Sequence, residues 1–135
     1  MKTEDPRRAL GAAGEAAAAR ALEASGHRIV ARNVRAGGVE LDLVVTKGHT
    51  IAFVEVKTRR SGRAGAPEEA VDARKCARLV RGARAFLREH GARGRRVRFD
   101  VVSVVPDARG ALVATHRPGA FDAGDAAGGR DAGST

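Results

Sequence analysis

The stretch VELDLVVTKGHTIAFVEVK, residues 39–57, contains two apolar, β-branched runs separated by polar residues and a glycine. Such runs on either side of a turn predict a β-hairpin. We expect strands over 39–45 and 51–57, joined by a tight reversal at TKGHT, 46–50. Charged side chains are rarely buried without a partner. The two strands nevertheless carry Glu40, Asp42, Glu55 and Lys57.

The register of this hairpin decides whether two of its acids meet. A reversal centred after Gly48 places Asp42 opposite Glu55, and the alternation of Leu41 and Leu43 with the acids of the first strand favours that register. Opposed Cβ atoms in a strand pair lie about 4.5–5.5 Å apart, so two carboxylates there repel each other unless a cation lies between them. Mg²⁺ or Mn²⁺, with oxygen ligands from one or two carboxylates, suits this position.

Lys57 would face Glu40 in the same register, and it shares a strand face with Glu55. Beside a metal site, a lysine with a lowered pKa can orient or deprotonate an attacking water. A salt bridge with either glutamate explains the same spacing, and the residues alone leave both interpretations open.

The remaining elements predict one α/β domain. We expect a helix over TEDPRRALGAAGEAAAARALEASGH, capped by Thr3 or Asp5 and stopped at Gly26, and a second helix from Pro67 to His90. Further strands are predicted over 27–34, 97–105 and, more weakly, 111–116. The order is α-β-β-β-α-β with one more strand. The domain would span 1–116, and 117–135, which is low in core-forming residues, would be a disordered tail.

Two smaller features are given structural interpretations. Asp100, in the middle of the strand over 97–105, is expected to pair with Arg98 on the same face. The spacing of the histidines is not typical of metal ligands. These are His27, His49, His90 and His116.

The chain is strongly basic, with a formal net charge of +9. This favours a polyanionic partner such as nucleic acid, although the abundance of Arg, Ala and Gly also fits GC-rich codons. The positive excess lies between Lys57 and Arg98, in a Gly-rich loop over 59–67 and an arginine stripe on the second helix. The stripe consists of Arg74, Arg78, Arg81, Arg84 and Arg88. The expected phosphate contacts are Arg59, Arg60, Arg63, Arg74, Lys75, Arg78 and Arg81.

Cysteine usage and hydropathy suggest a compartment. The single cysteine, Cys76, cannot form an internal disulfide, which fits a reducing cytosol. The N-terminus has no apolar signal core, and no uninterrupted apolar stretch is long enough to span a membrane. We therefore expect a cytoplasmic protein with no membrane partner.

Five motifs in order resemble the uncharacterised bacterial YraN family, which is similar to archaeal Holliday-junction resolvases and belongs to the PD-(D/E)xK superfamily. They are Gly14-Glu15, VELDL at 39–43, FVEVKTR at 53–59, APEEAV with Lys75, and RFDVV at 98–102. The resemblance implies a restriction-endonuclease-like core, a mixed sheet flanked by helices. Val39 stands where the family has a glycine, and Leu41 stands where the superfamily name has a proline; neither position is a metal ligand.

The resemblance also implies residue roles. Asp42 matches the metal-binding aspartate, and Glu55 with Lys57 matches the (D/E)xK pair. Glu15 matches a helix glutamate of the resolvases, and Glu40 would be accessory. By analogy with the resolvases, a homodimer is expected.

Three functions follow from the sequence. The first is a Mg²⁺-dependent nuclease acting on DNA phosphodiesters, including branched or recombination and repair DNA. The second is a non-catalytic nucleic-acid-binding adaptor with the same fold. The third is a structural or partner-binding protein whose charge reflects codon usage.

Overall fold

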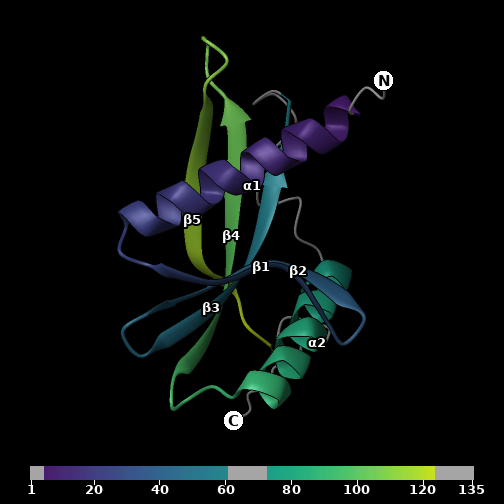
Figure 1. Ribbon diagram of the computed structural model, residues 1–135, viewed down its shortest axis with the longest axis vertical. Coiled ribbons are helices and arrows are strands. Elements are labelled where there is room, and N and C mark those ends of the chain that lie inside the picture. Colours follow the sequence, from purple (N-terminus) through teal and green to yellow (C-terminus); the bar gives the residue numbers. More distant parts are fainter. Residues whose placement is uncertain (1–4, 61–72, 124–135) are drawn as a thin grey trace.

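The computed structural model describes residues 5–60 and 73–123. A five-stranded mixed sheet is flanked by two helices (Figure 1). The elements are α1 (Pro6–Ala24), β1 (Arg28–Ala36), β2 (Val39–Lys47), β3 (Thr50–Thr58), α2 (Ala73–His90), β4 (Arg96–Pro106) and β5 (Leu112–Phe121). The α/β prediction, with a helix, three strands, a helix and two further strands, is confirmed. The expected start of the second helix and part of the Gly-rich loop lie outside the described residues.

The strands follow one another in the sheet in chain order. β1, β2 and β3 form an antiparallel meander, and β4 pairs with β5 in the same antiparallel way. β3 and β4 are parallel, so their connection must cross the sheet, and α2 lies within it. The meander and this crossover place α1 on one face of the sheet and α2 on the other.

α1 begins and ends as the sequence predicts. The Asp5 side chain accepts a hydrogen bond from the backbone N–H of Arg7 at 3.0 Å, and Gly26 has a left-handed φ of 93° after the last turn. The buried face of the helix is mostly alanine, so α1 packs close to the sheet. A Cβ atom at Gly14 would overlap the side chain of Thr58 on β3, so this glycine permits the close approach.

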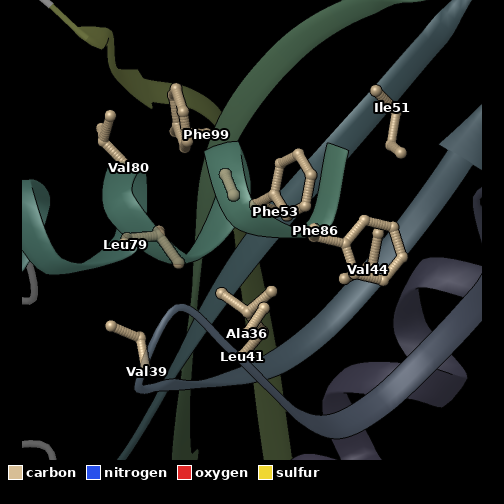
Figure 2. Close-up of a cluster of buried hydrophobic side chains, with 11 residues drawn as sticks. Ala36, Val39, Leu41, Val44, Ile51, Phe53, Leu79, Val80, Phe86 and Phe99 are labelled. Atoms are coloured by element: carbon tan, nitrogen blue, oxygen red, sulfur yellow. The ribbon is translucent and has the colours of Figure 1, made fainter. Parts of the chain in front are cut away.

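α2 is amphipathic, as predicted. Its buried side contributes Leu79, Val80, Ala83 and Phe86 to a cluster with β2, β3 and β4, shown in Figure 2. All five arginines of the stripe are exposed. Neither described helix has a segment long and apolar enough to cross a membrane.

β5 runs past the end expected at His116. The backbone N–H of Gly119 donates to Asp100 Oδ1 at 3.0 Å, and Phe121 stacks on Phe99 with ring centroids 5.2 Å apart. These contacts hold residues 117–121 on the sheet, so a tail beginning at 117 is wrong for this segment. The composition of residues 117–121 did not predict this extension of β5, because the residues that hold the segment lie on β4. The rest of the expected tail, 124–135, lies outside the described residues.

Candidate functional site

The predicted register of the β2–β3 hairpin is confirmed from the turn to Leu43, which pairs with Val54. Beyond that pair the ladder stops. Asp42 Oδ2 instead accepts a hydrogen bond from the backbone N–H of Val56 at 2.8 Å. A side-chain carboxylate therefore takes the place of a backbone carbonyl, and the regular pairing of the two strands ends where the acids stand.

β2 also changes faces at Asp42. Leu41 packs in the cluster beneath α2, whereas Leu43 packs in the cluster beneath α1. The regular alternation of these two leucines was therefore a wrong expectation. The register that it supported holds from the turn to Leu43, but Asp42 and Glu55 do not form a ladder pair. Helices cover both faces of the sheet, so a strand can switch its apolar residues between faces without exposing them.

Four charged residues of the hairpin line one cleft of about 270 Å³, together with two cations of α2. Glu55 Oε2 and Lys57 Nζ are 3.7 Å apart, which makes the salt bridge considered from the sequence a real contact. The cleft residues with charge are Glu40, Asp42, Glu55, Lys57, Lys75 and Arg78. The fold thus joins the acid-rich end of the hairpin to the N-terminal half of α2.

α1 brings a further carboxylate to this cluster. Burial raises the pKa of Glu15, and the charges of Glu40 and Glu55 raise it further, against a hydrogen bond from the Asn33 side chain. Asn33 lies on β1 with a left-handed φ of 49°. Sequence reasoning missed Asn33; its one local signal was an asparagine, a residue that tolerates left-handed backbone, inside a strand.

The carboxylate of Asp42 is the most perturbed acid of the cluster. Burial raises its pKa to about 7, and repulsion from Glu55, Glu15 and Glu40 acts in the same direction, against the hydrogen bond from Val56. A carboxylate in this position accepts a proton or a cation more readily than an exposed one.

The pKa of Lys57 is shifted in the opposite direction, below its ordinary value. Burial, a hydrogen bond to Lys75 and the nearby charges of Lys75 and Arg59 lower its pKa, while Glu55 opposes the shift. The arrangement therefore favours a neutral amine in the cleft beside the carboxylates.

The donor set fits a hard divalent cation. Among the described residues, no three His, Cys, Asp or Glu side chains converge closely enough to hold a metal ion by themselves. Mg²⁺ commonly takes one or two carboxylates and completes its shell with water and phosphate oxygens. Asp42 and Glu55 supply such a pair, and a bound cation would offset the burial and the carboxylate repulsion that raise the pKa of Asp42.

The expected phosphate contacts do not all lie in the described part of the chain. Arg59 is half-buried, and Arg60, Arg74, Lys75, Arg78 and Arg81 are exposed. Arg63 lies outside the described residues. Lys75 and Arg78 belong to the cleft itself, so these two place positive charge beside the acids.

A separate polar cluster surrounds Asp100, which is completely buried. Arg98 pairs with it through two hydrogen bonds of 2.8 and 2.7 Å, as expected. His116 Nε2 contacts the same carboxylate at 2.7 Å, and His27 Nε2 contacts Arg98 at 3.0 Å. The sequence did not predict that two histidines would meet here, because His116 lies on β5 and His27 lies in the connection between α1 and β1.

The profile of the uncharacterised protein family UPF0102 matches residues 14–104. The chain belongs to this family. A UPF0102 protein of Symbiobacterium thermophilum is 51% identical over 78% of this chain and 89% of its own length. One from Nitratidesulfovibrio vulgaris is 46% identical over 94% of both chains. One from Beutenbergia cavernae is 50% identical over 88% of this chain and 98% of its own.

A search of solved structures finds Pyrococcus furiosus SfsA in complex with Ca²⁺, with 18% identity and a TM-score of 0.38. The match covers 80% of the present UPF0102 chain and 62% of SfsA. The names of the UPF0102 relatives state no activity.

Proposed function

We propose that this UPF0102 protein is a Mg²⁺- or Mn²⁺-dependent phosphodiesterase acting on DNA. The observation that carries the proposal is the cleft in which Asp42, Glu55 and Lys57 meet, with one acid pKa raised and the lysine pKa lowered. Titratable groups perturbed in opposite directions within one cleft are typical of acid–base sites. Their order along β2 and β3 matches the PD-(D/E)xK pattern that the sequence resembles.

Asp42 and Glu55 would hold the cation. When bound, a divalent cation neutralises phosphate charge and acts as a Lewis acid on a phosphoryl oxygen. The hydrogen bond from Val56 fixes one oxygen of Asp42, so the carboxylate is oriented before any ligand arrives. Glu55 is oriented by its contact with Lys57.

Lys57 has the position of a base or of a water-orienting group. Its lowered pKa increases the fraction of neutral amine at Nζ, which can accept a proton from water attacking phosphorus. In its protonated form the same group offsets the charge that develops on the phosphate oxygens. Lys75, which shares a hydrogen bond with Lys57, favours the neutral form through its own charge.

Glu15 and Glu40 would act on the edge of this site. Both lie close enough to raise the pKa of Asp42 by repulsion, and Glu40 lines the cleft. Glu15, held by Asn33, would orient water, Lys57 or a second cation. Exposed Arg78 and Lys75 would contact phosphates next to the scissile bond.

The first test is isothermal titration of Mg²⁺ and Mn²⁺ into the wild type and into Asp42→Ala, each with a branched DNA present. Saturable binding in the wild type that is lost in the variant supports the site and is followed by a cleavage assay on branched and linear duplexes. Glu23→Ala, an exposed glutamate of α1, is the matched control. Equal binding by wild type and Asp42→Ala would reject the assignment of this acid as a ligand.

A second candidate function is a non-catalytic nucleic-acid-binding adaptor. The observation in its favour is the arginine stripe of α2, which is exposed along the helix and needs no metal to bind a phosphate backbone. DNA binding that weakens with salt, is the same in EDTA and in Mg²⁺, and is unaffected by Asp42→Ala would favour this function over hydrolysis.

A further inference from the structure

A second cleft, of about 440 Å³, lies at the other end of α2 from the candidate site. It is lined by the start of β1, by the last turn of α2 and by the loop that follows α2. Arg28, Arg93 and Arg95 contribute to its wall, and none of the described residues that line it is acidic. A concave surface with three guanidinium groups and no carboxylate is suited to an anion.

The loop that carries two of these arginines is anchored to the β2–β3 turn. The backbone N–H of Arg96 donates to the His49 carbonyl at 2.6 Å, and Arg95 Nε donates to the Gly48 carbonyl at 3.3 Å. In Figure 1 the loop after α2 and this turn lie at the same end of the molecule. Half-buried Arg95 is therefore held in place, and among the described residues only Nε of its guanidinium donates a hydrogen bond.

Helix capping accounts for the histidine of the cleft but not for its arginines. His90 Nδ1 contacts the Phe86 carbonyl at 3.1 Å and its ring stacks on Phe86 at 4.2 Å, which explains a histidine at a helix C-terminus. Arg28 and Arg93 are exposed, and neither forms an ion pair with another described residue. Arg93 also has a left-handed φ of 54°, which is uncommon outside glycine and is often kept for function.

Exposed arginines connect this cleft to the candidate site. Arg78, which lines the candidate site, is followed on the same face of α2 by Arg81 and Arg88, at spacings of three and seven residues. From Arg78 to His90 the helix rises about 18 Å, at ~1.5 Å per residue. That length corresponds to about five base-pair steps of ~3.4 Å along duplex DNA.

We propose that the cleft formed by Arg28, Arg93 and Arg95 binds a backbone phosphate of the DNA whose scissile phosphate lies at Asp42 and Glu55, about five base-pair steps away. The inference rests on the proposed function for the position of the scissile phosphate, but the cleft contacts DNA whether or not hydrolysis occurs. A duplex arm would then lie along α2, with the arginines between the clefts against its backbone.

The test measures DNA binding in EDTA, so that hydrolysis plays no part. The affinity of a fluorescein-labelled duplex is measured by anisotropy over a salt series for the wild type, for Arg28→Gln/Arg93→Gln and for Arg20→Gln/Arg109→Gln. The last is a charge-matched control, because both of its arginines are exposed and lie on α1 and on the β4–β5 turn. Thermal unfolding of all three proteins checks that each is folded.

Each phosphate contact contributes about 0.9 to the slope of log affinity against log salt, so Arg28→Gln/Arg93→Gln, which removes the single phosphate contact proposed for the cleft, should lower the slope by about 0.9. The control should keep the wild-type slope. A methylphosphonate placed about five steps from the cleavage position should weaken the wild type and leave this variant unchanged. That pattern would place the contact at the second cleft.

Three results would overturn the inference: an unchanged slope in Arg28→Gln/Arg93→Gln, an equal fall in the control, or no duplex binding by the wild type. An equal fall of the slope in the control would mean that DNA binding depends on the total charge of the protein and not on this cleft. Loss of slope in the variant together with a wild type that never cleaves DNA would support the cleft and reject hydrolysis, so the two proposals can fail separately.

Discussion

Asp42 Oδ2 accepts a hydrogen bond from the backbone N–H of Val56 at 2.8 Å, across the point where the β2–β3 ladder ends. This one contact does two things. It satisfies a backbone donor that has lost its ladder partner, and it orients a carboxylate into the cleft that also holds Glu55 and Lys57. Regular pairing of the two strands thus ends at the position where the hairpin carries its acids.

Asp42→Asn should stabilise the metal-free protein at neutral and higher pH. The folded pKa of Asp42 is about 7 and its ordinary value is 3.8, so the contribution of this group to stability is complete below pH 3.8 and is lost as the pH rises through about 7. Asparagine does not ionise and still offers an oxygen to Val56. The gain at pH 8 is at most about 4 kcal/mol, at ~1.36 kcal/mol per pKa unit.

Urea denaturation in EDTA at pH 4 and pH 8 measures this gain. Wild type and Asp42→Asn should converge at pH 4 and separate at pH 8, whereas the exposed Glu23→Gln should follow the wild type throughout. A variant that is less stable than the wild type at pH 8 would mean that the ionised carboxylate is already well solvated.

Lys57→Arg should abolish most of the proposed cleavage and leave the affinity for DNA unchanged. The guanidinium keeps a positive charge in the cleft but does not give up a proton near neutral pH, so it cannot act as a base. Removal of a general base costs about 10²–10⁴-fold in rate. Single-turnover cleavage in Mg²⁺ and anisotropy in EDTA measure the two effects.

Lys47→Arg is the matched control for that substitution, because Lys47 lies on the same hairpin and donates to the Ser25 carbonyl, outside the cleft. It should leave both measurements unchanged. Full activity of Lys57→Arg would assign this residue a purely electrostatic role.

Gly14→Ala should destabilise the protein, and Gly11→Ala should not. A Cβ atom at Gly14 overlaps the side chain of Thr58, and overpacking of this kind costs about 1–3 kcal/mol. A Cβ atom at Gly11 meets nothing within 4 Å, so alanine there should gain about 0.5–1 kcal/mol of helix stability. Thermal and urea unfolding compare the two. Equal stabilities would show that α1 can move away from β3 without cost.

Asp100→Asn should cost about 3–5 kcal/mol at pH 7, because it leaves Arg98 without its buried partner. Burial alone would raise the pKa of Asp100, but hydrogen bonds from Arg98, Gly119 and His116 outweigh it and lower the pKa. The stability that this carboxylate contributes is therefore present above pH 3.8 and is lost as the pH falls through its lowered pKa.

Denaturation at pH 7 and pH 3 measures that loss. The gap between wild type and Asp100→Asn should narrow at pH 3, while exposed Glu89→Gln stays close to the wild type at both. A constant gap would assign the effect to packing and not to charge.

Much of the fold could be predicted from the sequence because its signals are local. The Asp5 cap and the Gly26 stop of α1, the amphipathic face of α2 and the turn of the β2–β3 hairpin depend on neighbouring residues, and each is confirmed. The predictions failed where contacts with residues distant in the sequence determine the structure. β5 continues to Phe121 because Asp100 and Phe99 of β4 hold it.

The sequence by itself determined which residues of the hairpin carry charge and the register of the two strands from the turn to Leu43 and Val54. Only the tertiary structure decided that Asp42 binds the backbone of Val56, that α1 adds Glu15, and that α2 adds Lys75. The physical reason is that hairpin register follows from turn geometry over a few residues. Burial and repulsion, which shift the pKa values of Asp42 and Lys57, depend instead on elements that meet only when the chain has folded.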